Sequence, residues 1–64
     1  MQNQDRFLIG KVAREFVSCL GFEAPAYLGE QAELAAEQGD ELSARAWRDI
    51  ADAAERVAED RVAA

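Results

Sequence analysis

The side chains that could do chemistry in this sequence are carboxylates, one thiol and two hydroxyls. The chain has no histidine, and Cys19 is its single cysteine. Ser18 and Ser43 have no potential base at a recognisable spacing, and a serine nucleophile must be activated by an adjacent base. We therefore expect no enzyme active site, and the sequence favours a protein that acts by binding.

Cysteine and metal chemistry are also disfavoured by the residue pattern. Cys19 follows the apolar spacing of its segment and precedes Leu20, so we expect a small buried hydrophobe instead of a reactive thiol, which needs exposure and a nearby cation. A zinc site is rarely built without histidine. Glu33 and Glu37 are one helical turn apart, but calcium-binding loops have a different spacing. We expect no metal and no cofactor.

Carboxylates are concentrated in the middle of the chain. No Lys or Arg lies between Gly21 and Ala44, whereas the net charges of the two flanks, +1 and −1, cancel and leave the −6 of the whole protein in this segment. The six acids of the segment are Glu23, Glu30, Glu33, Glu37, Asp40 and Glu41. Side chains three and four residues apart share one side of a helix. Glu30, Glu33 and Glu37 have this spacing, and we call them the acidic ridge.

The acidic ridge has two interpretations. A solvated acidic face would simply keep a small protein soluble. Alternatively, the ridge docks on a basic surface of a partner protein, such as the surface of a nucleic-acid-binding complex, with Glu23, Asp40 and Glu41 extending the contact. Carboxylates would repeat about every 5–6 Å along the ridge, which loosely imitates the spacing of phosphates. The net negative charge disfavours direct binding to nucleic acid or to an anionic membrane.

Three helices are expected to position these residues. Apolar residues at spacings of three and four predict a helix over residues 5–20. Pro25 suits the first position of a helix over residues 25–38, and Asp40 is a good N-cap for a helix over residues 41–62. The sequence therefore predicts an all-α fold, a three-helix bundle with short loops.

Glycines and the chain length set the remaining boundaries. Gly21 and Gly39 are placed to end the first two helices in the left-handed conformation. At 64 residues the chain is expected to form a single helical domain over 1–64.

The inward faces of the helices are predicted from the spacing of the apolar residues. On the first helix they are Leu8, Ile9, Val12, Ala13, Phe16, Cys19 and Leu20. On the second they are Tyr27, Leu28, Ala32, Leu34 and Ala35. On the third they are Leu42, Ala46, Ile50, Ala53, Ala54, Val57 and Ala58, with Trp47 at the edge. Phe22 is expected to fold back onto Val17. Because 14 of the 32 hydrophobic residues are alanine, and domains below roughly 70–80 residues usually need a staple or a partner, we expect either a tight core or a self-associating chain.

Self-association provides an alternative function. Phe7 falls on the polar side of the first helix, and the apolar arc of that helix reaches Val17. A large aromatic residue on a polar face is either scattered surface or part of an interface. In the alternative, the protein is a structural homodimer that self-associates through Phe7 and Val17, and its acids serve solubility only.

The second half of the chain has an alanine-rich helix, a Gly-Asp turn and a helix carrying Ala-x-x-Trp-Arg-x-Ile, here Gly39, Asp40, Ala44, Trp47, Arg48 and Ile50. In this it resembles a group of short, uncharacterised helical bacterial proteins, and the resemblance implies the fold but no chemistry. In size, helicity and acidic charge the chain is similar to small phage-type inhibitors such as anti-CRISPR proteins that imitate DNA. This compositional similarity implies a non-catalytic inhibitor.

Location is predicted from what the sequence lacks. The segment MQNQD has no basic residues of the kind that begin a signal peptide, and no apolar run approaches the roughly 20 residues of a membrane span. A lone cysteine fits a reducing compartment. We expect a cytoplasmic protein.

Overall fold

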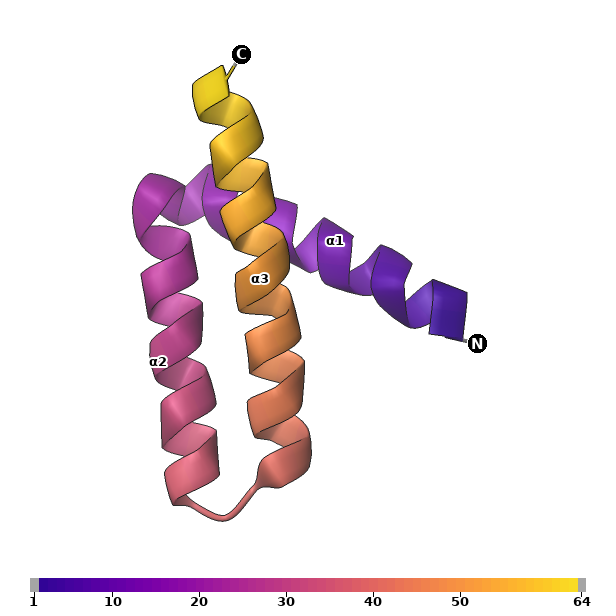
Figure 1. The fold of residues 1–64 in the computed structure, drawn as a ribbon, viewed down its shortest axis with the longest axis vertical. Coiled ribbons are helices and arrows are strands. Elements are labelled where there is room, and N and C mark those ends of the chain that lie inside the picture. Colours follow the sequence, from indigo (N-terminus) through magenta and orange to yellow (C-terminus); the bar gives the residue numbers. More distant parts are fainter. Residues whose placement is uncertain (1, 64) are drawn as a thin grey trace.

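Helices account for nearly all of the fold (Figure 1). The computed structural model describes the backbone of residues 2–63 and the side chains of residues 7–61. In chain order the elements are α1 (Gln2–Leu20), the 3-10 turn η1 (Gly21–Glu23), α2 (Ala24–Glu37) and α3 (Glu41–Ala63). No strand occurs in the described backbone. The predicted all-α class is therefore confirmed, with helix boundaries within three residues of those expected.

Two glycines end helices, as predicted. Gly21 has φ +64° and Gly39 has φ +81°, both in the left-handed region that is costly for residues with a Cβ. At the end of α2 the Gly39 N–H donates to the carbonyl of Ala36 at 3.0 Å, and the Asp40 N–H donates to the carbonyl of Ala35 at 2.9 Å. These two bonds are the Schellman pattern, which satisfies carbonyls left unpaired at a helix end.

The start of α3 is capped by Asp40. Its Oδ1 accepts a hydrogen bond from the Ser43 backbone N–H at 3.1 Å. Its carbonyl accepts the first helical bond of α3, from the Ala44 N–H at 3.0 Å. The sequence-based N-cap prediction is confirmed. One residue thus both closes the turn after α2 and begins the next helix.

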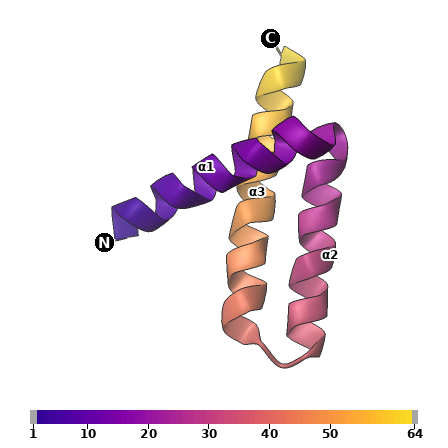
Figure 2. The same ribbon diagram turned by 180° about the vertical axis from the view of Figure 1, so that it is seen from behind.

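Helices α2 and α3 form an antiparallel hairpin, and α1 crosses it at a steep angle (Figures 1 and 2). The crossing lies near the end of the hairpin where α2 begins, so the N-terminal half of α1 extends past α3. The Cα atoms span 39 × 28 × 15 Å. The three helices do not lie alongside one another, and the expected three-helix bundle is not confirmed. The chain continues from α1 through η1 into α2 with no loop residue between them, whereas the non-helical residues 38–40 reverse the chain between α2 and α3.

Alanine dominates the core of the described part of the chain. The buried apolar residues there are Ala13, Val17, Ala24, Leu28, Ala32, Ala35, Ala44, Ala54 and Ala58. Only Leu28 and Val17 are large side chains that are fully buried. Because helix separation depends on side-chain size at the contact, alanines allow α2 and α3 to pack closely. Half-buried Phe16, Trp47, Ile50 and Val57 pack around this narrow core.

The predicted inward faces of α2 and α3 are wrong in part. Leu34 is 48% exposed, Leu42 is 82% exposed, and Ala46 is also exposed. The prediction followed the largest apolar side chains, whereas the hairpin is joined through small ones. Ala44 was not predicted to be buried but is fully buried, whereas Leu42 was predicted to be buried and is exposed.

The predicted face of α1 also needs correction. Leu8, Cys19 and Leu20 are exposed instead of buried. Val17, predicted at the edge of the apolar arc, is only 1% exposed and lies in the core. Phe22 is exposed and does not fold back onto Val17. Since α1 meets the hairpin only near one end, much of its apolar stripe has no helix to pack against.

Candidate functional site

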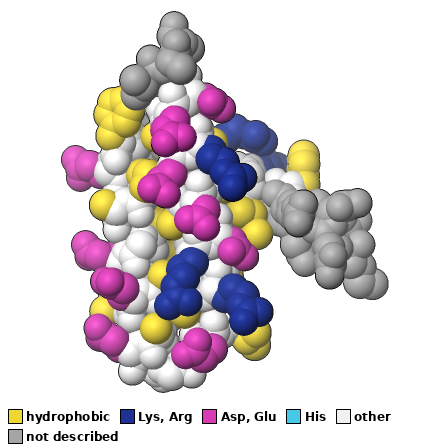
Figure 3. Space-filling view, in the orientation of Figure 1, with side chains coloured by type: hydrophobic (Ala, Val, Ile, Leu, Met, Phe, Trp, Pro, Cys, Tyr) yellow, Lys and Arg dark blue, Asp and Glu magenta, His cyan; other side chains and the backbone are white. Residues whose placement is uncertain are grey.

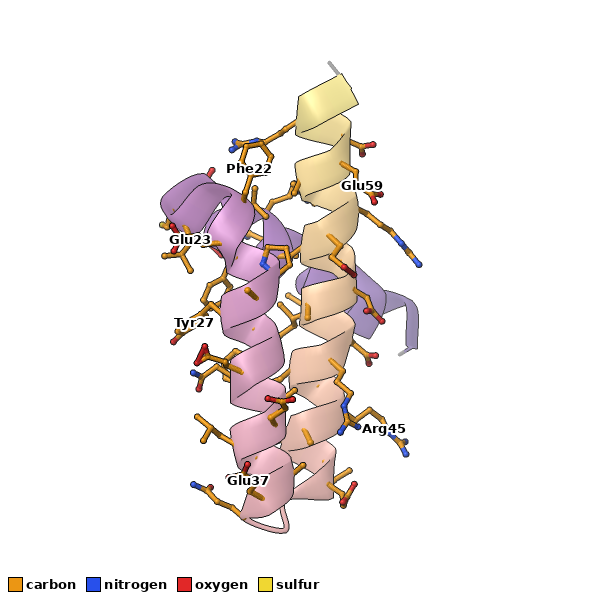
Figure 4. All side chains as sticks on the ribbon, turned by 60° about the vertical axis from the view of Figure 1, so that its left-hand side comes forward. Phe22, Glu23, Tyr27, Glu37, Arg45 and Glu59 are labelled. Carbon is orange, nitrogen blue, oxygen red and sulfur yellow. The ribbon has the colours of Figure 1, made fainter. Side chains whose placement is uncertain are left out.

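All six acids of the predicted contact are exposed. They lie in η1 (Glu23), on α2 (Glu30, Glu33 and Glu37), in the loop before α3 (Asp40) and in the first turn of α3 (Glu41). The buried residues of α2, such as Leu28 and Ala35, point to the core. Helical periodicity places Glu30 and Glu37 on the opposite side of this helix. Figure 4 shows Glu23, in η1, projecting away from α3.

Glu33 differs from the other two members of the acidic ridge in its surroundings. It lines a shallow groove between α2 and α3 together with Arg48, Asp52 and Glu55. The acidic surface therefore continues from α2 onto α3, where the acids alternate with arginines (Figure 3). Sequence reasoning missed Asp52 and Glu55 because it considered only the acids between Gly21 and Ala44, where no Lys or Arg balances them.

Asp40 and Glu41 have roles at the start of α3. Hydrogen bonds from the Ser43 hydroxyl and, second, from the Ser43 backbone N–H hold the pKa of the Asp40 carboxyl below its usual value. The Asp40 carboxylate is therefore engaged as a cap. Glu41 lies in the first turn of α3, where a negative charge is favourable against the helix dipole. These two acids are less available to a partner than the three of the ridge.

Two partly exposed apolar side chains lie next to the glutamates of α2. Tyr27 and Leu34 are about half exposed, and they alternate with the acids at spacings of four and three in the order Glu23, Tyr27, Glu30, Leu34, Glu37. Residues at these spacings follow one side of a helix. Tyr27 and Leu34 therefore lie beside the glutamates, on the edge of α2 where Tyr27 meets Phe16 of α1. Sequence reasoning missed this because it assigned both residues to the core.

The residues predicted for self-association are separated by the structure. Phe7 is 65% exposed, whereas Val17, on the side of α1 that packs in the core, is buried. Val17 is therefore unavailable for a contact with another molecule. The exposed Cys19 lines an apolar surface hollow with Phe16, Leu20 and Tyr27, and with Glu15 at its rim.

The described residues show neither a metal-binding cluster nor a membrane-spanning helix. They contain no cluster of three or more His, Cys, Asp or Glu side chains that could hold a metal ion. None of the helices, as far as they are described, is both long and apolar enough to cross a membrane.

The fold and this surface define an all-α protein whose helical hairpin carries an exposed acidic side. No protein-family model matches the chain, and no significantly similar protein was found among curated proteins or among solved structures. The resemblance to short bacterial proteins around Trp47 and Arg48 therefore stays a prediction.

Proposed function

We propose that the protein is a non-catalytic binding protein whose acidic ridge docks on a basic surface of a partner protein. The observation that carries the proposal is the exposure of Glu30, Glu33 and Glu37 on a segment that has no Lys or Arg between Gly21 and Ala44. Such a ridge attracts a basic surface over a distance comparable to the Debye length, about 8–10 Å at physiological salt. Complementary charge of this kind speeds association and selects the partner.

The proposed partner is a protein whose basic surface also holds nucleic acid. A ridge of carboxylates occupying that surface would exclude the nucleic acid, as a small anti-CRISPR-like inhibitor or DNA mimic would. The proposed setting is the cytoplasm.

The homodimer alternative through Phe7 and Val17 is not proposed in that form. Val17 is part of the intramolecular core, so one of the two residues on which that alternative rests cannot reach another molecule. Exposure of Phe7 alone is compatible with scattered surface.

The test replaces the three ridge glutamates by Gln and measures partner capture. The triple variant E30Q/E33Q/E37Q and the wild type serve as bait in extracts of the source cells at low and high salt, and a protein retained only by wild type is then purified. We expect its dissociation constant for the triple variant to be about tenfold or more higher at low salt. Duplex DNA should compete with the wild-type protein for the same partner.

A matched control removes three acids from the exposed surface of α3. The variant D49N/E59Q/D60N changes the net charge by the same amount, and all three residues are exposed. This control should retain most of the binding if the position of the charges matters. Equal loss in both variants would show that only net charge acts, and undiminished binding by the ridge variant would reject the proposal. Far-UV circular dichroism checks that helicity is unchanged.

A further inference from the structure

One side of the hairpin is left partly uncovered by α1. Figure 2 shows α1 crossing near one end, so that the hairpin towards the Gly39 loop has no helix over it. Phe16, Tyr27 and Trp47, one from each helix, meet on this side. Helical spacing places Leu8 and Val12 on the same side of α1 as Phe16, and Leu34 on the same side of α2 as Tyr27. We call them the inner-angle patch, and they are Leu8, Val12, Phe16, Tyr27, Leu34 and Trp47. Leu8 is 55% exposed, Tyr27 is 43% exposed, and Leu34 is exposed to a similar extent, while the other three are half-buried.

Phe16 connects the three helices of the inner-angle patch. Its ring centroid lies 5.9 Å from that of Tyr27 on α2 and 6.4 Å from that of Trp47 on α3. Leu8 and Val12 precede Phe16 at steps of four residues, and residues four apart lie on the same side of a helix. The row Leu8, Val12 and Phe16 therefore extends the apolar surface along α1, from the crossing towards the free half of the helix.

The molecule exposes more surface than a monomer of its mass usually does. Its accessible surface is 4954 Å² for 7.0 kDa, whereas the scaling of monomeric proteins gives about 4,000 Å². The difference, about 900 Å², is close to the area of about 800 Å² that each partner contributes to a standard protein interface. The excess exposed area therefore matches one half of a stable interface.

The internal core is too thin to account for a stable isolated domain. Among residues 7–61, seven of the nine buried apolar residues are alanine, and an alanine side chain contributes little apolar area. Chains of this length with no disulfide or metal usually obtain the missing burial by oligomerisation.

From these observations we infer that a second copy of this chain covers the inner-angle patch, in a two-fold symmetric dimer. Such an interface uses the same surface on both chains. The patch suits this because it contains both a projecting side chain, the exposed Leu8 on the free half of α1, and a receiving side of exposed Tyr27 and Leu34 with half-buried Trp47 beside them. The α1 helix of one copy lies over the hairpin of the other, and the two chains together complete the helical bundle that one chain leaves open.

This dimer differs from one built on Phe7 and does not depend on the proposed function. Phe7 lies on the opposite side of α1, the side that carries Lys11 and Arg14, as the helical spacing requires. The six residues of the inner-angle patch are uncharged. Each chain carries a net charge of −6, so the two copies repel one another, and screening by salt strengthens the dimer. Binding of a basic partner to the acidic ridge has the opposite salt dependence.

The experiment measures mass and tryptophan emission over one concentration series of the whole chain. Sedimentation equilibrium should give a mass that rises with concentration from 7.0 kDa towards twice that value, and at a lower concentration when salt is added. Trp47 is the single tryptophan and lies in the patch. Its emission should therefore shift to shorter wavelength over the same concentration range.

A matched pair of variants locates the interface. Leu34 lies in the inner-angle patch, and Leu42 is an exposed leucine outside it. We expect Leu34→Gln to raise the dimer dissociation constant about tenfold, and Leu42→Gln to leave it within about twofold.

Three results would overturn the inference. They are a mass of one chain at all concentrations up to the millimolar range, a doubled mass without a shift of the Trp47 emission, and equal weakening by the two variants. Should Leu34→Gln lose helicity, the concentration dependence of the wild-type Trp47 emission decides the question alone. A failure of this dimer would leave the proposed function standing, because the acidic ridge is on the outer side of α2.

Discussion

The residues that end or begin helices were predicted correctly from their amino-acid types. Gly21, Gly39 and Asp40 were assigned to helix ends from their types and neighbours, and the structure confirms all three. Turn and cap geometry depends on hydrogen bonds within about five residues, so the sequence contains the whole interaction. The exposed state of Cys19 could not be predicted in this way, because it depends on whether another helix covers its side of α1.

The cap at Asp40 predicts a pH dependence. Because its pKa is lowered in the folded protein, the unfolded chain binds a proton more readily, and the carboxylate stabilises the fold above its ordinary pKa near 3.8. This stabilisation is fully present at neutral pH and is lost as the pH falls through the lowered pKa. Asp40→Asn keeps a capping side chain that does not titrate.

Thermal unfolding followed by circular dichroism from neutral pH down to about pH 2 checks this prediction. As the pH falls through the acid range, the Tm of wild type should decrease more than the Tm of Asp40→Asn. Asp40→Ala, which removes the cap, should lower Tm by a few degrees at neutral pH. A pH-independent difference between wild type and Asp40→Asn would contradict the assigned hydrogen bonds.

At the scale of helices, the sequence predicted which segments are helical and where each helix begins and ends. It did not predict which side of each helix faces its neighbours. Apolar periodicity and helix-end residues place α1, α2 and α3 to within three residues. The rotation of α2 and α3 about their axes was assigned from Tyr27, Leu34 and Leu42. In the structure, close packing through Ala32, Ala44 and other alanines turns these larger residues outwards. Periodicity alone does not say which of two adjacent apolar stripes faces a neighbour.

Two glycines of the hairpin provide a matched test of backbone conformation. A Cβ added at Gly29 or Gly39 would meet no atom within 4 Å, but only Gly39 has a positive φ. Gly39→Ala should destabilise the protein by about 1–2 kcal/mol because of the left-handed conformation. Gly29→Ala, inside α2, should stabilise it by about 0.5–1 kcal/mol. Urea unfolding at a fixed protein concentration measures both, and the same sign for both changes would contradict the turn geometry.

At the scale of the whole molecule, the steep crossing of α1 was not predictable from the sequence. The chain passes from α1 through the helical turn Gly21–Glu23 into α2 without a loop. The short connection was visible, but the angle it imposes depends on backbone geometry that composition does not reveal. This angle leaves the inner-angle patch uncovered, next to the acidic ridge on α2, and no residue belongs to both sets.

The small core concentrates stability in few side chains. Leu28 is one of two large side chains that are fully buried, whereas Leu42 is 82% exposed. Leu28→Ala should cost about 2–5 kcal/mol, which is enough to unfold most of the molecules of a small domain. Leu42→Ala should change the free energy of unfolding by less than about 0.5 kcal/mol. Helicity at 222 nm during chemical denaturation compares the two, and similar costs would contradict the assigned core.

A body only 15 Å thick along its shortest axis has a thermal consequence. The heat capacity of unfolding increases with the apolar surface that becomes hydrated, and a lone chain that buries mostly alanine has little such surface to release. The stability curve of the isolated chain is therefore weakly curved, so its free energy of unfolding changes almost linearly with temperature.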